Sequence, residues 1–95
     1  MAAYVLAQLD VHNPEDFETY RAKVAPLIEA FGGRYIVRGG EVTPLEGELS
    51  APRLVIIEFE DRSAAERWYH SDEYQQILPL RLNNANGTAV IVDGV

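Results

Sequence analysis

Apolar and polar residues alternate at the start of the chain, between residues 3 and 11. Every second position there is apolar, from Val5 through Ala7 and Leu9 to Val11. A period of two is that of a β-strand with one face buried. We therefore expect the chain to begin with a strand.

The period of the apolar residues then lengthens to that of a helix. From residue 17 to residue 31 they recur at steps of three, four and seven, which predicts one apolar stripe along an amphipathic helix. Asn13 followed by Pro14 is typical of a helix start, and the pair Gly32-Gly33 is typical of a left-handed helix end. We expect Pro26, inside this helix, to kink it around a sheet.

Two further strands are predicted after this helix. Residues 34–38 and 53–59 are rich in β-branched side chains, and the second of these segments is apolar on both faces, as expected in the middle of a sheet. Between them, Gly39-Gly40 predicts a turn or bulge, residues 41–45 a weaker extended arm, and residues 48–52 a loop.

The last third of the chain predicts a second helical region and a final strand. The segment Ser63-Ala-Ala-Glu66 has the spacing of a capping box, in which hydroxyl and carboxylate satisfy unpaired backbone N–H groups at a helix start. Ser71 starts another helical turn, and Pro79 bends or ends that segment. Residues 83–87 are expected to form a polar loop, and residues 88–92 the last strand.

The predicted elements follow the order β-α-β-β-α-β. Crossover connections then place both helices on one face of an antiparallel sheet. We expect an α+β fold of ferredoxin-like type in a single domain, residues 1–95. The face without helices still carries large apolar side chains, namely Tyr4, Leu6, Leu54 and Ile56. Because a patch of this size is too large to leave in water, we expect a homodimer that pairs through these sheet faces as a dimeric α/β barrel.

Three stretches of the sequence are similar to a known family. They are Gly32-Gly33-Arg34-Tyr35-Ile36-Val37-Arg38-Gly39-Gly40, Leu45-Glu46-Gly47 and Trp68-Tyr69-His70-Ser71-Asp72-Glu73-Tyr74-Gln75. Together they resemble the domain-of-unknown-function family numbered 1330, of the dimeric α/β-barrel group, over nearly the whole chain. The resemblance implies a ferredoxin-like subunit that pairs sheet to sheet, and it implies no catalytic residue. Phe31 departs from the family's pattern, in which His is expected before the two glycines in many relatives.

The charge balance excludes two classes of partner. Fifteen acidic residues against eight basic ones give a formal charge of −7. Such a surface repels nucleic-acid phosphates and anionic lipid headgroups, so we expect no nucleic-acid and no membrane partner. Seven of the eight basic residues are Arg, which hold planar anions in paired hydrogen bonds, so the composition allows a small anionic ligand. Without a signal-peptide pattern or an apolar stretch of about 18 residues, we expect a cytoplasmic protein.

Few residues are suited to acid-base or metal chemistry. The chain has no Cys, and its two His residues, His12 and His70, lack the spacing of metal ligands. We therefore expect no metal and no bound cofactor. His70 is the candidate catalytic proton carrier because imidazole titrates near neutral pH, and the alternative is a surface His that caps a helix.

The candidate ligand-binding residues combine aromatic rings with guanidinium groups. They are Arg38, Trp68, Tyr69, Tyr74 and Arg81. Tyr20 and Tyr35 are expected to approach the same rings from the first helix and the second strand. Aromatic rings with polar tips often line binding sites, although each alone is equally typical of a core, and the arginines could instead form salt bridges.

Two functions fit these features. The first is a small enzyme that acts without metal or cofactor on an aromatic or carboxylate-bearing metabolite, an interpretation that rests on analogy between folds. The second is a non-catalytic dimer that binds a small molecule or has a structural role. A cavity of a few hundred cubic ångströms between sheet and helices, with polar groups turned inward, would favour the enzyme or binder.

Overall fold

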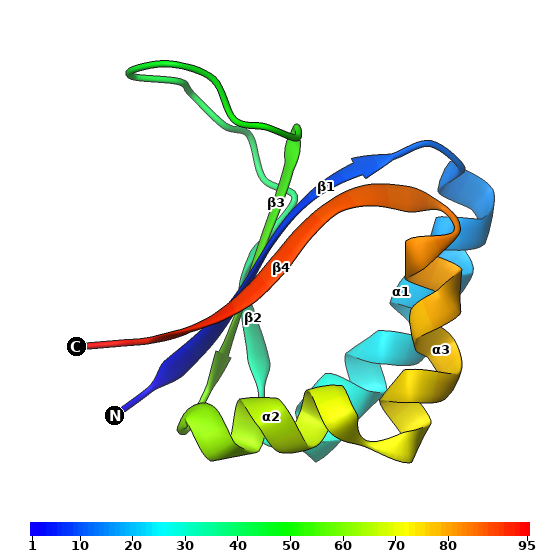
Figure 1. Cartoon of the computed structure of the whole chain (residues 1–95), viewed down its shortest axis with the longest axis vertical. Coiled ribbons are helices and arrows are strands. Elements are labelled where there is room, and N and C mark those ends of the chain that lie inside the picture. The colour runs from blue at the N-terminus through cyan, green and yellow to red at the C-terminus, as the bar shows by residue number, and fades with distance from the viewer.

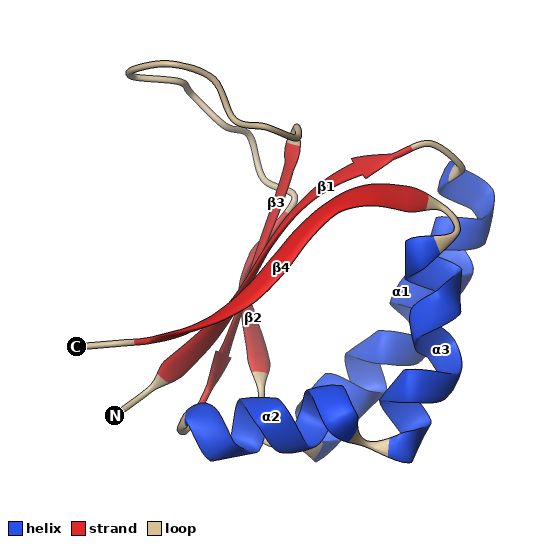
Figure 2. Cartoon of the chain, in the orientation of Figure 1, coloured by secondary structure: helices blue, strands red, loops and turns tan.

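A computed structural model describes all residues from 1 to 95 and contains one antiparallel sheet with three helices on one face (Figures 1 and 2). The elements in chain order are β1 (Ala3–Val11), α1 (Pro14–Ala30), β2 (Arg34–Arg38), β3 (Arg53–Phe59), α2 (Arg62–His70), α3 (Asp72–Leu82) and β4 (Ala85–Asp93). The strand order in the sheet is β2-β3-β1-β4. This is the predicted ferredoxin-like fold, with the second helical region divided into two helices.

Alternate side chains of the central strand β1 face two different environments. It pairs antiparallel with β3 on one side and with β4 on the other. Val5, Ala7 and Leu9 are buried against the helices, whereas Tyr4 and Leu6 lie on the opposite face and are half-buried. The period of two in the sequence therefore defines a helix face and an outer face of the sheet.

The first helix buries the stripe that its sequence predicts. Phe17, Tyr20, Val24 and Ile28 are its buried residues, and they pack on the helix face of the sheet. The helix ends before Gly32, whose φ of 82° requires the left-handed conformation that glycine adopts without strain. The predicted helix start and end are both confirmed.

Local features of two segments differ from the predictions. The side chain of Asp61, not the segment around Ser63, caps α2 by accepting a hydrogen bond of 2.8 Å from the backbone N–H of Ala64. Asp61 stands two residues earlier and takes that N–H, so the helix begins before the predicted capping box. The arm predicted at 41–45 is not a strand, because the pairing of β2 with β3 ends at Arg38 opposite Val55.

The final strand is longer than predicted. Ala85 already pairs with Val11, so part of the predicted polar loop at 83–87 belongs to β4. The helix α3 also continues through Pro79 and ends at Leu82, whose side chain is exposed and not in the core. Within the predicted loop, Asn86 is an exposed strand residue, whereas Asn83 and Asn84 precede β4, and Asn84 is buried with its Nδ2 donating to the carbonyl of Leu80.

The outer face of the sheet is apolar across all four strands. Its half-buried or exposed apolar side chains are Tyr4, Leu6, Ile36, Val37, Leu54, Ile56, Val90 and Val92. Leu6 stands directly between Ile56 and Val90 in the register of the sheet. A face of this kind favours burial against another surface. No helix in the structure has the length and apolar character needed to cross a membrane.

Candidate functional site

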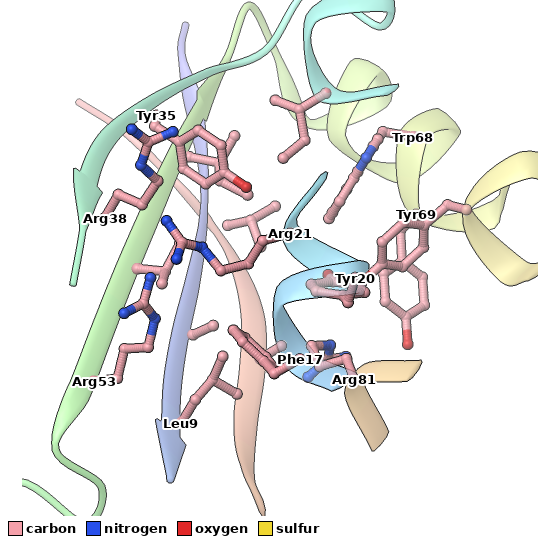
Figure 3. Close-up of a pocket in the computed structure, with 17 residues that line it drawn as sticks. Leu9, Phe17, Tyr20, Arg21, Tyr35, Arg38, Arg53, Trp68, Tyr69 and Arg81 are labelled. Carbon is pink, nitrogen blue, oxygen red and sulfur yellow. Dashed lines mark hydrogen bonds between the residues drawn. The ribbon is translucent and has the colours of Figure 1, made fainter. Parts of the chain in front are cut away.

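A cavity lies between the helix face of the sheet and the three helices (Figure 3). The cavity has a volume of about 50 Å³, which is room for a few water molecules or one small chemical group. The residues around it are Val5, Ala7, Leu9, Phe17, Tyr20, Arg21, Ile28, Tyr35, Arg38, Arg53, Val55, Ile57, Trp68, Tyr69, Tyr74, Arg81 and Ala89. The cavity is smaller than the few hundred cubic ångströms expected of a full ligand pocket.

A wider groove adjoins this cavity. It has a volume of about 380 Å³ and shares Leu9, Phe17, Arg21 and Arg53 with the cavity wall. Its other lining residues come from the end of β1, the start of α1 and the two ends of the loop between β2 and β3, and they include the carboxylates of Asp10 and Glu18. We call the cavity the chamber and the adjoining groove its mouth.

Aromatic rings from three helices build the apolar part of the chamber. The rings of Trp68 and Tyr74 lie with their centroids 4.3 Å apart, and Tyr69 packs against both. Tyr20 meets Tyr74 edge to face, and their hydroxyl oxygens are 2.8 Å apart. The rings therefore support one another and fix two hydroxyl groups in the interior.

The buried phenols stay protonated over a wide pH range. Burial, with the neighbouring Tyr74, raises the pKa of Tyr20 far above its ordinary value. Burial also raises the pKa of Tyr35, although Arg38 and Arg21 act in the opposite direction. A protonated phenol can donate a hydrogen bond, so neither group is suited to act as a base near neutral pH.

One arginine is buried in the chamber without a carboxylate. Arg81, on α3, is 8 % exposed, and none of the four ion pairs in the structure includes it. Figure 3 shows its guanidinium beside Phe17 and Tyr20. Charged side chains are almost never buried in this way unless they are paired.

Three other arginines stand where the chamber meets the groove, and we call Arg21, Arg38 and Arg53 the mouth arginines. They come from α1, β2 and β3 and turn toward one another around Tyr35 and Phe17 (Figure 3). The guanidinium of Arg38 lies 5.1 Å from the ring centroid of Tyr35, and that of Arg53 lies 5.9 Å from that of Phe17. Cation–π contacts of this geometry hold the cations without neutralising them.

The mouth arginines are poorly compensated by acidic groups. Arg21 pairs with Glu18 at 2.8 Å, whereas Arg38 and Arg53 take part in no ion pair. Burial and the charge of Arg21 lower the pKa of Arg53. The guanidinium of Arg53 packs against Gly39, so a Cβ at position 39 would collide with it.

Polar groups in the chamber wall are donors. Two buried nitrogens in the structure have no hydrogen-bond partner, Trp68 Nε1 and Arg53 Nε, and both residues line the chamber. The lining contains no Asp, Glu or His, and no group of three or more such side chains gathers elsewhere. With arginine, indole and protonated phenols as its polar groups, the chamber offers hydrogen-bond donors to an acceptor that the protein does not supply. Such a wall is unsuited to a metal ion, which needs ligands with free electron pairs, such as carboxylate oxygens or imidazole nitrogens.

The structure brings together the five candidate ligand-binding residues named from the sequence. Arg38, Trp68, Tyr69, Tyr74 and Arg81 all line the chamber, as do Tyr20 and Tyr35. The candidate proton carrier does not: His70 is exposed at the end of α2, in a shallow groove with Arg62 and Val90.

The sequence analysis did not identify two arginines of the site, Arg21 and Arg53. Arg53 has the same strand parity as Val55 and Ile57, which are buried against the helices. Arg21 follows Phe17 by four residues on α1 and so belongs to its buried side. Strand parity therefore identifies Arg53, and helical spacing from Phe17 identifies Arg21.

Comparison with known proteins places the chain in a family. Residues 2–95 match the model described as Domain of unknown function (DUF1330). The chain belongs to this family. No curated protein matches the sequence.

Solved structures share the fold of this DUF1330 protein at low sequence identity. A protein of unknown function from Rhodopseudomonas palustris, RPA0582, is 15% identical with a TM-score of 0.79, covering 99% of this chain and 82% of its own. A dimeric ferredoxin-like protein of unknown function from Jannaschia sp. CCS1 is 14% identical with a TM-score of 0.73, covering 99% and 100%. SnoaB, a cofactor-independent oxygenase from Streptomyces nogalater, is 14% identical with a TM-score of 0.64, covering 99% and 93%. These likenesses establish the ferredoxin-like fold.

Proposed function

We propose that this protein binds a small planar molecule that carries a carboxylate or another acidic oxygen, with the acidic group inside the chamber. The observation that carries the proposal is the buried Arg81, which has no ion pair and stands in a wall of hydrogen-bond donors. The aromatic rings of Trp68 and Tyr74 suit the planar part of the molecule.

An energetic argument supports a ligand over a purely structural role. A largely buried charge without a partner is disfavoured, and a fully buried polar group without a hydrogen bond, such as Arg53 Nε or Trp68 Nε1, costs about 1–3 kcal/mol. A structural core would use apolar side chains at the positions of Arg81 and Arg53. An incoming acid would supply the acceptors for these groups and offset both costs.

The assembly that we propose for the binder is a homodimer that pairs through the outer faces of its sheets. The apolar residues of that face support this arrangement, and so does the dimeric state of the ferredoxin-like protein from Jannaschia. The chamber opens on the opposite side of the sheet, so each protomer would keep its own site.

Catalysis without a cofactor is the second candidate function. SnoaB, which shares the fold, is a cofactor-independent oxygenase. The feature of this chain that favours catalysis is the set of donors without a base, since such a set stabilises an oxyanion and lowers the pKa of an acidic substrate. The proton would pass to water, and the chamber would hold the resulting enolate or phenolate for reaction.

Binding of small aromatic acids tests the main proposal. Isothermal titration calorimetry with benzoate, cinnamate and naphthoate should detect binding that Arg81→Met weakens by about tenfold or more, as expected for a charge-assisted hydrogen bond. Because Met removes an uncompensated charge, the same variant should keep or raise the free energy of unfolding, by about 1 kcal/mol.

Arg67→Met is the matched control, since Arg67 is exposed on α2 outside the chamber and should not alter affinity. Equal affinities in both variants, or no binding of any acid, would refute the proposal. For the catalytic alternative, the visible absorbance of 4-nitrophenolate reports ionisation in the site, and a bound nitrophenol with an unchanged pKa would exclude oxyanion stabilisation.

A further inference from the structure

The positive charges of the site stand in two separate places. Arg81 comes from α3 and lies beside Tyr20 and Phe17, while the mouth arginines gather on the side of β2 and β3 (Figure 3). The groove at the mouth is lined by Arg21 and Arg53 but not by Arg81. Phe17 lies between Arg81 and Arg53 (Figure 3).

The two sets of charge act on different phenols. Arg81 lowers the pKa of Tyr20 against the stronger effect of burial, and no mouth arginine is among the groups that shift it. Arg38, Arg21 and Arg53 act in the same sense on Tyr35, and Arg81 does not. The two regions still adjoin, since Tyr35 is among the groups that raise the pKa of Tyr20, and Tyr74 is among those that raise the pKa of Tyr35.

Neither place is neutralised from within the chain. The one ion pair between the site and an acidic residue joins Arg21 to Glu18, which leaves Arg38, Arg53 and Arg81 unpaired. The chain as a whole has a formal charge of −7, and two of its acidic residues, Asp10 and Glu18, line the groove at the mouth, but neither forms an ion pair with Arg38, Arg53 or Arg81. One acid bound at either place would leave the other place uncompensated.

We infer that the natural ligand carries two acidic groups at opposite ends, one held by Arg81 in the chamber and the other by the mouth arginines, with a flat apolar part between them. This inference rests on the proposed function and specifies the class of ligand for that site. The chamber volume of about 50 Å³ limits the inner end to a small group, such as a carboxylate or a phenolic oxygen on the edge of a ring. The wider groove of about 380 Å³ receives the remainder.

Aromatic diacids of increasing length test the inference by calorimetry. The probes are terephthalate, 4-carboxycinnamate and biphenyl-4,4'-dicarboxylate, each compared with the monoacid in which a methyl group replaces one carboxylate. We expect at least one diacid to bind about tenfold or more tightly than its monoacid, since a second charge-assisted contact forms. Arg81→Gln and Arg53→Gln should each remove this advantage, and Arg67→Gln, remote from the site, should preserve it.

The outcomes distinguish failure of the diacid inference from failure of the proposed binding function. If monoacids and diacids bind equally and only one of the two site variants weakens them, the inference is wrong and the proposed binding function stands. If no acid binds, both fail. Near-ultraviolet circular dichroism verifies that each variant retains its packed aromatic core, and Arg81→Lys, which keeps the charge, provides a second folded variant that should retain part of the diacid advantage.

Discussion

The hydroxyl groups of Tyr20 on α1 and Tyr74 on α3 lie 2.8 Å apart in the interior, and each is the other's hydrogen-bond partner. The residues are 54 positions apart in the sequence, so this bond ties the first helix to the last. It also fixes two rings of the chamber wall. The pair therefore connects the stability of the fold to the shape of the site.

Removing both hydroxyls of this pair should destabilise the protein by less than the sum of the two single losses. Tyr20→Phe leaves the buried Tyr74 hydroxyl without a partner, at a cost of about 1–3 kcal/mol in the free energy of unfolding. The double variant with Tyr74→Phe should lose less than the sum of the single losses. Urea unfolding at fixed protein concentration measures this. Tyr69→Phe is the control, because its hydroxyl makes no intramolecular hydrogen bond among those in the structure, and additive losses would contradict the coupling.

Stability should fall in alkaline solution because of the same tyrosine. The pKa of Tyr20 in the folded protein lies above its ordinary value of 10.0, so the contribution of this residue is complete below pH 10.0. Above that pH the unfolded chain releases the proton and the folded chain does not, and unfolding becomes easier by about 1.4 kcal/mol for each pH unit. Tyr20→Phe should reduce this slope in chemical denaturation. An identical slope in the variant would show that Tyr20 ionises normally.

Gly39 and Gly40 form a matched pair for testing the mouth of the site. Gly39 has a φ of 69°, and a Cβ there would collide with the guanidinium of Arg53, whereas a Cβ on Gly40 meets open space. We expect Gly39→Ala to lower the free energy of unfolding by about 1 kcal/mol and to weaken binding of aromatic acids by displacing Arg53. Gly40→Ala should leave affinity unchanged. Calorimetry that finds the two variants equal would show that Arg53 does not contribute.

A lysine in the middle of the outer face should separate the proposed dimer. Leu6 lies between Ile56 and Val90 in the sheet, at the centre of the apolar patch. Burying an unpaired ammonium costs several kcal/mol, so Leu6→Lys should raise the dissociation constant roughly 100-fold or more in analytical ultracentrifugation. Thr19→Lys, on the exposed side of α1, is the control with the same added charge. A dimer that persists with Lys at position 6 would mean that another surface forms it.

The strands and the first helix were predictable from the sequence because their signals are local. The period of two in β1 and the β-branched run of β3 depend only on neighbouring residues, and the observed bounds of β2 and β3 agree with the predicted ones. The start of α2 was mispredicted because Asp61 and Ser63 are both suitable N-cap residues, and a pattern alone does not show that Asp61 accepts from the Ala64 N–H and starts the helix two residues earlier. The extended arm at 41–45 failed because a strand needs a partner, and β3 offers none there.

The candidate site was predictable in part for a similar reason. The aromatic residues near α2 and α3 are close in sequence, so Trp68, Tyr69 and Tyr74 could be grouped by their spacing along the chain. Arg21 and Arg53 come from distant elements, and their side chains meet only once the sheet has paired and the helices cover one face. The burial of Arg81 without a paired acid depends on tertiary contacts, and the local sequence carries no signal of it.

The alternation of β1 has a consequence for how this family can change over evolution. One set of its residues, Val5, Ala7 and Leu9, forms the chamber wall, and the set between them, with Tyr4 and Leu6, forms the outer face. Point substitutions can alter ligand choice and pairing surface independently, since each touches one face. An insertion or deletion of a single residue within the strand would exchange the faces and destroy both at once. We therefore expect lineages of this chain to diverge in β1 by substitution while its length stays constant.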